Sequence, residues 1–148
     1  MVNFDLCELL PYVPVPMSNR SLPSDRILVL VVEDEPAVRA VAVETLEIDG
    51  FKVIEAPSAD YAVTILQSRD DVRVLFTDVT MPGHLNGFDL AQVAKTLHPN
   101  ISVIVTSGAL PSGFSGLAPE ARFLQKPYRM TGVIRLIHEL TTDESHSR

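Results

Sequence analysis

Short apolar runs alternate with segments of helical periodicity along most of this chain, and this alternation constrains its fold more than any other feature. The run Ile27–Val32 is uniformly apolar and rich in β-branched residues, which is typical of a strand buried on both faces. Similar runs predict strands at 51–56, 72–77, 101–105 and 122–125. Strands that alternate with helices predict an α/β domain, with a five-stranded parallel sheet covered by helices on both faces.

Helical stripes lie between the predicted strands. The first helix is expected to begin at Pro36, because the first turn of a helix tolerates proline, and to end at Gly50. Ser58 is a candidate N-cap for the second helix. The strongest stripe, in 130–140, predicts the last helix of the domain.

Three segments depart from this alternation. Residues 1–24 hold four of the eleven prolines, so we expect an irregular arm there, either a docking segment or a dispensable leader, with the leader favoured. Residues 108–120 contain three glycines and two prolines, which predicts a fourth helix that is short or partly unwound. The domain is then expected to span 25–141, followed by a polar tail at 142–148.

Composition excludes several classes of protein. The net charge of −7 disfavours nucleic acid and anionic membranes as partners. The longest apolar run is far shorter than the roughly 20 residues that a bilayer requires. A single cysteine permits neither an internal disulfide nor a zinc site built from cysteines. The first ten residues contain no Lys or Arg, so no secretory signal is expected and a cytoplasmic location is predicted.

Polar side chains follow four of the five predicted strands. Glu33 and Asp34 follow the first strand, Asp78 the third, Thr106 the fourth and Lys126 the fifth. Because ligands bind at the carboxyl ends of the strands in α/β sheets, these side chains are expected to converge. Each residue alone is explained as a cap, a turn former or solvated surface, but their complementary chemistry at successive strand ends indicates a site.

The residue types at these strand ends suit phosphoryl transfer. Neighbouring carboxylates repel one another unless they bind a hard cation such as Mg²⁺. Asp78 can then act as a nucleophile toward phosphorus and form an aspartyl phosphate. The ammonium of Lys126 and the hydroxyl of Thr106 would bind oxygens of the transferred group, alongside the cation.

The chain from residue 26 to about 141 closely resembles the receiver domain of two-component response regulators, of the stand-alone, chemotaxis-receiver-like kind. Segments in matching order and spacing carry the resemblance: Ile27–Pro36, Leu75–Gly83, Asn86–Leu90, Val103–Gly108 and Phe123–Tyr128. The family has a flavodoxin-like strand order, 2-1-3-4-5, which is therefore expected here.

The resemblance also implies roles for the metal-site residues. Asp78 would be the phosphoacceptor. Glu33, Asp34 and Asp78, together with the backbone carbonyl of Thr80, would hold Mg²⁺, with Asp34 as a direct ligand and Glu33 acting through water.

Further roles implied by the resemblance concern the conformational switch. Thr106 matches the switch hydroxyl that moves toward the phosphoryl group, and Phe123 matches the aromatic residue that moves with it. Lys126 matches the phosphate-binding lysine, and its peptide bond to Pro127 would be cis.

The function implied is a single-domain response regulator that accepts a phosphoryl group from a sensor histidine kinase or a histidine phosphotransfer protein. It would signal by conformational switching and protein–protein contact rather than act as an enzyme. A homodimer stays open as a further partner. In the family the partner face comprises helix four, strand five and helix five. The Gly/Pro-rich segment 108–120, where helix four is expected, puts a standard dimer on this face in doubt.

Two alternatives remain open. One is an Mg²⁺-dependent phosphohydrolase that uses Asp78 as its nucleophile. Such enzymes usually carry a second Asp two residues later as acid and base, whereas this chain has Thr80 there. The other is an interaction module on a receiver scaffold that is not phosphorylated. Replacement of Asp34, Asp78 or Lys126 by another residue type would favour this alternative, but all three are present.

Overall fold

The computed structural model describes residues 27–108 and 121–146. The arm predicted at 1–24 lies outside the described residues, and so does nearly all of the segment 108–120 in which a short fourth helix is predicted. Among the described residues, no helix combines the length and apolar character needed to cross a bilayer.

A five-stranded parallel sheet forms the centre of the domain. Its strands lie in the order β2-β1-β3-β4-β5, as predicted. The strands are β1 (Leu28–Val32), β2 (Lys52–Ala56), β3 (Val74–Asp78), β4 (Ser102–Ser107) and β5 (Arg122–Gln125). All four neighbouring pairs are parallel, so the carboxyl ends of the strands lie along one edge.

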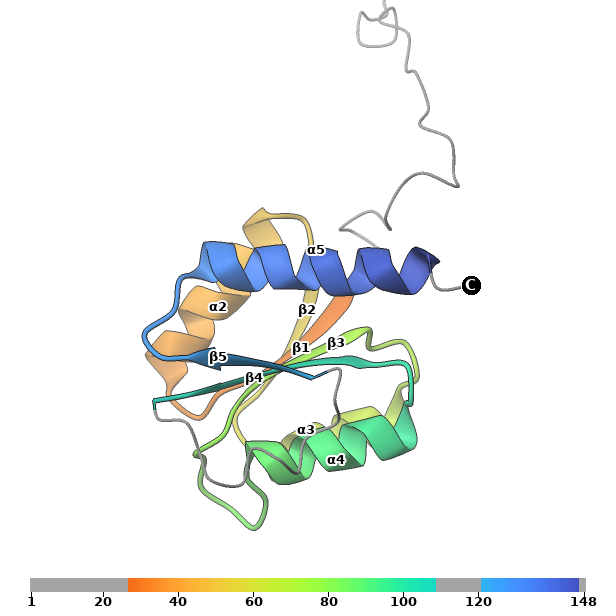
Figure 1. Ribbon diagram of the computed structural model, residues 1–148. Coiled ribbons are helices and arrows are strands. Elements are labelled where there is room, and N and C mark those ends of the chain that lie inside the picture. Colours follow the sequence, from red (N-terminus) through yellow and green to blue (C-terminus); the bar gives the residue numbers. More distant parts are fainter. Residues whose placement is uncertain (1–26, 109–120, 147–148) are drawn as a thin grey trace, which may run out of the picture.

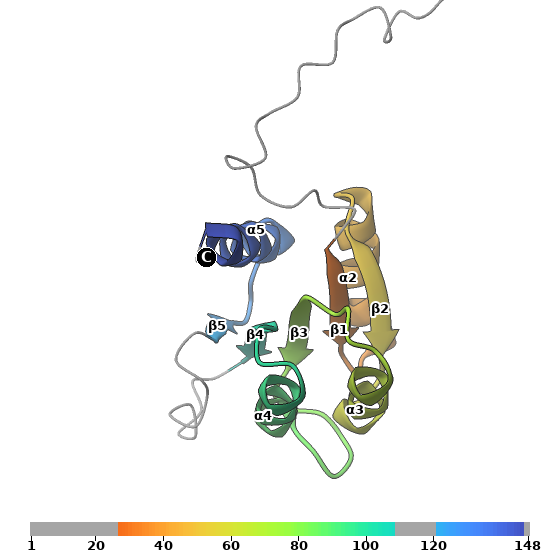
Figure 2. The ribbon, with the colours of Figure 1, turned by 90° about the vertical axis from the view of Figure 1, so that its right-hand side faces the viewer.

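Helices cover both faces of the sheet, which confirms the predicted architecture. They are α2 (Pro36–Ile48), α3 (Ala59–Ser68), α4 (Gly87–Leu97) and α5 (Met130–His146). Helices α2 and α5 lie on one face, and α3 and α4 on the other (Figures 1 and 2). The local signals act as predicted: Pro36 opens α2, Gly50 follows its end with a φ of 103°, and the Ser58 hydroxyl accepts a hydrogen bond from the Tyr61 N–H at 3.1 Å.

The last helix is longer than its apolar stripe predicts. Helix α5 continues to His146, so residues 142–146 of the predicted polar tail are helical. Val133, Ile137 and Leu140 are buried and hold the first part of the helix on the sheet. Because elongation of a formed helix is much easier than its nucleation, the polar residues extend it.

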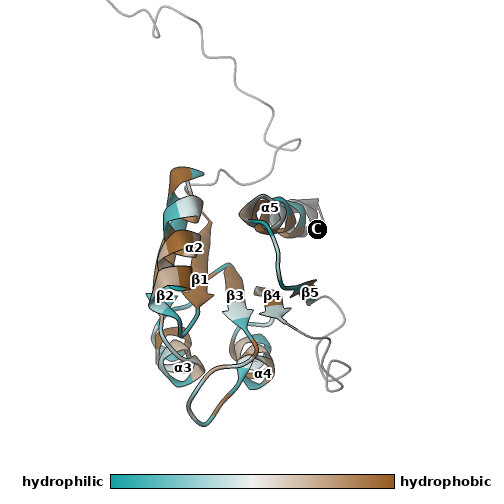
Figure 3. Cartoon of the chain, turned by 90° about the vertical axis from the view of Figure 1, so that its left-hand side faces the viewer, coloured by the Kyte–Doolittle hydropathy of each residue, from teal (hydrophilic) through white to brown (hydrophobic). Residues whose placement is uncertain are grey.

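Alternation along the strands divides the core into two layers. Leu28, Leu30 and Val32 of β1 pack with α3 and α4, whereas Val29 and Val31 pack with α2 and α5. Strand β1 is buried along its whole length and is apolar throughout (Figure 3).

The same alternation positions the end of β3. Phe76 belongs to the layer beside α2 and α5. Because strand side chains alternate with a period of two, Asp78 points to the same side, at the carboxyl edge.

Helix α4 begins directly behind Asp78, and only glycine fits at its first residue. A Cβ on Gly87 would overlap the carbonyl oxygen of Asp78 and would lie 2.8 Å from the Cα of Val79. The Gly87 N–H donates to the Val79 carbonyl at 2.8 Å, which holds the two backbones together. This close approach fixes the backbone that carries the Asp78 side chain.

Replacing Gly87 by Ala should lower the free energy of unfolding by about 3 kcal/mol, because backbone must move to admit the methyl group. Urea unfolding followed by circular dichroism measures this loss. Gly132→Ala is the matched control, since a Cβ there meets nothing within 4 Å, and it should stabilise α5 by up to about 1 kcal/mol. Equal effects of the two substitutions would contradict the packing described here.

Candidate functional site

Three carboxylates meet at the carboxyl edge of the sheet, as predicted. Oxygen atoms of Glu33, Asp34 and Asp78 all lie within 4.8 Å of one another. Glu33 and Asp34 follow β1, and Asp78 ends the neighbouring strand β3. Glu33 and Asp78 are buried, whereas Asp34 is exposed, so the cluster opens to solvent on one side.

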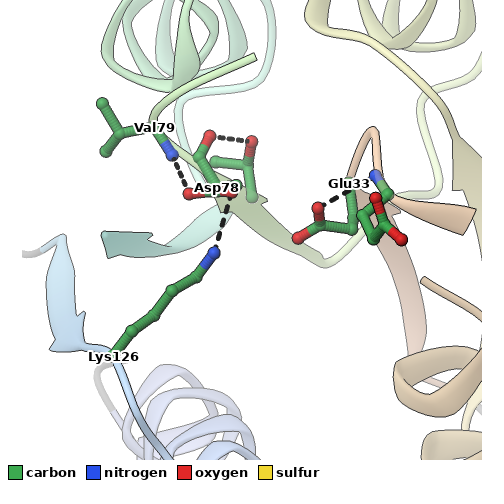
Figure 4. A network of polar contacts seen from close by, with 6 residues as sticks. Glu33, Asp78, Val79 and Lys126 are labelled. Carbon is green, nitrogen blue, oxygen red and sulfur yellow. Dashed lines mark hydrogen bonds and ion pairs between the residues drawn. The ribbon is translucent and has the colours of Figure 1, made fainter. Parts of the chain in front are cut away.

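Both carboxylate oxygens of Asp78 accept hydrogen bonds. Lys126 Nζ donates to Asp78 Oδ2 at 2.9 Å, and the Val79 N–H donates to Oδ1 at 2.8 Å (Figure 4). The Val79 N–H also lies 2.9 Å from the carbonyl oxygen of Thr106. Hydrogen bonds between charged groups are short and strong, so the Asp78 side chain is held in one orientation.

Burial and neighbouring charges shift the pKa values of Glu33 and Lys126. Burial raises the pKa of Glu33 above its ordinary value, and the negative charge of Asp78 adds to this rise. Partial burial acts to lower the pKa of Lys126, but the hydrogen bond and the charge of Asp78 outweigh it, so that this pKa lies above its ordinary value. The ammonium therefore stays charged beside the acidic cluster.

Glu33 is oriented by neighbours at the start of α2. Its Oε2 accepts a hydrogen bond from the Glu35 N–H at 3.1 Å. Arg39 Nη1 donates to the Glu33 carbonyl at 2.7 Å, while Arg39 Nε pairs with Glu55 Oε1 at 2.9 Å. Sequence reasoning did not single out Arg39. Its place one turn into the helix could have indicated a contact with Glu33, because helical side chains lean back toward the N-terminus.

Thr106 lies beside Asp78 on the neighbouring strand. The two residues are paired in the β3–β4 register, and Thr106 is buried. A cavity of about 10 Å³, roughly the space of one water molecule, is lined by Glu33, Asp78, Thr106 and Tyr128 among others.

Tyr128 both packs in the core and lines this cavity. Its ring meets Phe76 edge-on with centroids 5.9 Å apart. Burial raises the pKa of the Tyr128 phenol. The sequence does not identify Tyr128 as a site residue, because the contact of the segment after β5 with the cavity depends on tertiary structure.

Three further predictions concern Thr80, the peptide bond before Pro127, and Phe123. Thr80 lies in the loop two residues beyond Asp78, and the peptide bond between Lys126 and Pro127 is cis, as the resemblance implies. Phe123 is half-buried on β5 and packs against the layer of α3 and α4.

The donor set fits Mg²⁺. The cluster offers carboxylate oxygens from Glu33, Asp34 and Asp78, and it contains neither imidazole nor thiolate. Mg²⁺ prefers oxygen ligands and usually binds one or two carboxylates together with water and phosphate oxygens.

A protein-family model described as the response regulator receiver domain matches residues 29–138. This chain belongs to the response regulator receiver domain family. Curated relatives include the sensor kinase CckA of Brucella abortus, which is 34% identical over 76% of this chain and 12% of its own length. The response regulator ORR11 of Oryza sativa is 33% identical over 73% of this chain and 76% of its own length.

Solved receiver structures share the fold. A response regulator receiver protein from Sinorhizobium medicae has a TM-score of 0.74 at 25% identity, covering 78% of this chain and 94% of its own. The receiver domain of the hybrid histidine kinase CckA has a TM-score of 0.66 at 29% identity, covering 77% and 98%. This receiver chain spans only 12% to 23% of the length of several curated relatives, which are larger proteins.

Proposed function

We propose that this receiver domain accepts a phosphoryl group on Asp78 in an Mg²⁺-dependent reaction. The observation that carries the proposal is the meeting of three carboxylates within 4.8 Å, with Lys126 Nζ 2.9 Å from Asp78 Oδ2. Glu33, Asp34, Asp78 and the backbone carbonyl of Thr80 would hold the cation. Mg²⁺, when bound, would neutralise the carboxylates and bind one phosphoryl oxygen.

The transfer is a substitution at phosphorus. A carboxylate oxygen of Asp78 forms the new bond, while the bond between phosphorus and an imidazole nitrogen of the donor breaks. The bonding electrons leave with the imidazole. Lys126 would then bind a phosphoryl oxygen in place of Asp78 Oδ2, and the hydroxyl of Thr106 would bind another.

Thr106 would couple phosphorylation of Asp78 to a conformational change at the surface of the domain. It is buried and pairs in register with Asp78 on one side and with Leu124 of β5 on the other. A shift of Thr106 toward the phosphoryl group would favour a second arrangement of β4 and β5, including Phe123. Signalling by such a population shift requires that the phosphoryl group bind this second arrangement better.

The proposed phosphodonor is a sensor histidine kinase or a histidine phosphotransfer protein, and an apolar groove beside the site fits its approach. The groove has a volume of about 680 Å³ and is lined by residues of α2 and of the segment that follows β5. Val38 and Val41 are 42% and 57% exposed there. Lys126 lines the groove and also contacts Asp78, so a protein that delivers phosphate to Asp78 would approach next to this surface.

Val41→Asp should slow phosphotransfer from a cognate protein donor roughly tenfold, because the new carboxylate must be desolvated in the apolar contact. Phosphorylation by acetyl phosphate should be unchanged, since that donor is too small to need the groove. Ile48→Asp, at the far end of the same helix and 79% exposed, is the matched control. An equal effect of both substitutions, or slower reaction with acetyl phosphate, would contradict this docking surface.

The phosphorylation itself is tested by intact-mass measurement after incubation with acetyl phosphate. A gain of one phosphoryl group with Mg²⁺, and none with EDTA, is expected. Continuous release of phosphate at enzymatic rates would instead support the phosphohydrolase. If the mass did not increase with Mg²⁺ or with EDTA, the result would support an interaction module that is not phosphorylated.

A further inference from the structure

The loop between β3 and α4 carries part of the proposed metal site. It starts immediately after Asp78 and contains Thr80, whose carbonyl is a proposed ligand. Figure 2 shows the loop at the carboxyl edge of the sheet, beside α3 and α4. The base of the loop is closed by the hydrogen bond from the Gly87 N–H to the Val79 carbonyl at 2.8 Å. The far side of the loop needs a second anchor if Thr80 is to stay in place.

Asp60, in the first turn of α3, provides this anchor. Its Oδ2 accepts a hydrogen bond from the backbone N–H of His84 at 3.1 Å. A Cβ on Gly83 would lie 2.8 Å from the same oxygen, and Gly83 has a φ of +112°. The turn at Gly83 and His84 therefore sits directly against the carboxylate, and glycine permits both the contact and the backbone conformation.

Capping of α3 does not account for this contact. Ser58 already caps the helix, since its hydroxyl accepts from the Tyr61 N–H at 3.1 Å. Asp60 bonds instead to a backbone group 24 residues away in the sequence. Asp60 lies in the first turn of α3, where a negative charge interacts favourably with the helix dipole, and a hydrogen bond from an N–H to a charged acceptor is strong.

We propose that Asp60 is a positioning residue for the metal site: by anchoring the loop at His84, it holds the Thr80 carbonyl where Mg²⁺ requires it. This inference rests on the proposed function. Mg²⁺ demands near-ideal octahedral geometry, so a ligand on an unanchored loop binds it less well. Residues that orient metal ligands without touching the metal typically change affinity by about 10- to 100-fold.

Calorimetric titration with Mg²⁺ tests this role without any phosphodonor. Asp60→Ala should weaken Mg²⁺ binding about tenfold, whereas Asp60→Asn, whose amide oxygen can still accept the His84 N–H, should stay within about twofold of the wild type. Asp70→Ala is the matched control because it removes an exposed carboxylate beyond the end of α3 with the same change in charge. It should bind Mg²⁺ like the wild type.

Hydrogen exchange in the metal-free protein provides a second readout. The His84 amide should exchange faster in Asp60→Ala than in Asp60→Asn or in the wild type. Gly83→Ala perturbs the same contact from the loop side, and should weaken Mg²⁺ binding even if Asp60→Ala folds poorly.

The outcomes separate this inference from the proposed function. If the wild type binds no Mg²⁺, the proposed function is wrong and the positioning role falls with it. If the wild type binds Mg²⁺ and Asp60→Ala binds it equally well, the proposed metal site stands and the role of Asp60 is wrong. A loss of affinity in Asp60→Asn as large as that in Asp60→Ala would also contradict anchoring by the hydrogen bond to His84.

Discussion

Asp78→Asn should gain no phosphoryl group under conditions in which the wild type gains one. The neutral amide is a poor nucleophile toward phosphorus, whereas the carboxylate attacks directly. The substitution keeps the size of the side chain, and its amide oxygen can still accept from the Val79 N–H at the end of β3. The domain should therefore remain folded while acceptance of phosphate is lost. Intact-mass measurement with acetyl phosphate and Mg²⁺ checks this result.

Asp70→Asn is the control for this loss, because it changes the same chemical group at an exposed position between α3 and β3, away from the carboxyl ends of the strands. It should gain one phosphoryl group like the wild type. A full gain of mass in Asp78→Asn would place the acceptor on another residue, which peptide mapping would then locate.

Asp34→Asn should weaken Mg²⁺ binding by about a hundredfold or more. Asp34 is the exposed member of the carboxylate cluster and a proposed direct ligand, and an amide oxygen is a much weaker ligand for Mg²⁺ than a carboxylate. In the absence of metal, the same substitution relieves repulsion between close carboxylates. The melting temperature of the metal-free protein should therefore rise, while its increase on addition of Mg²⁺ should disappear.

Glu35→Gln is the matched control for Asp34→Asn. Glu35 is exposed and adjacent in sequence, and it supplies its backbone N–H rather than its carboxylate to Glu33. Calorimetry should show nearly unchanged Mg²⁺ affinity for this variant. If both substitutions weakened binding equally, general charge around the site would explain the affinity, and the assigned role of Asp34 would be wrong.

The fold and the main site residues were predictable because both depend on local patterns. An apolar run such as that of β1 identifies a buried strand, and parallel strands bring their carboxyl ends to one edge. The polar residues that follow the strands, such as Asp78 and Lys126, therefore had to meet. The strand order itself came from the resemblance to receiver domains, since no local signal specifies it.

The residues that support the site were not predictable in the same way. Arg39 reaches Glu55 across 16 residues, and Asp60 reaches His84 across 24. These contacts depend on how a helix packs beside a loop or a strand. Nothing in the sequence around either residue specifies which distant residue it will contact. The end of α5 was not predictable for a different reason. The apolar stripe stops at Leu140, but the helix continues to His146, beyond the apolar residues that hold it on the sheet.

The carboxylates of the site precede Lys126 in the chain, which has a consequence for incompletely folded copies of the domain. The three acids follow β1 or end β3, both of which precede β4 and β5 in the chain, whereas Lys126 directly follows β5, a four-residue strand at the sheet's edge. A nascent or frayed copy in which that edge has not docked displays crowded negative charge with no counter-ion from β5. If Asp78 is the phosphoacceptor, as proposed, we expect such a copy to accept phosphate poorly, so that phosphorylation would require the whole sheet to have assembled.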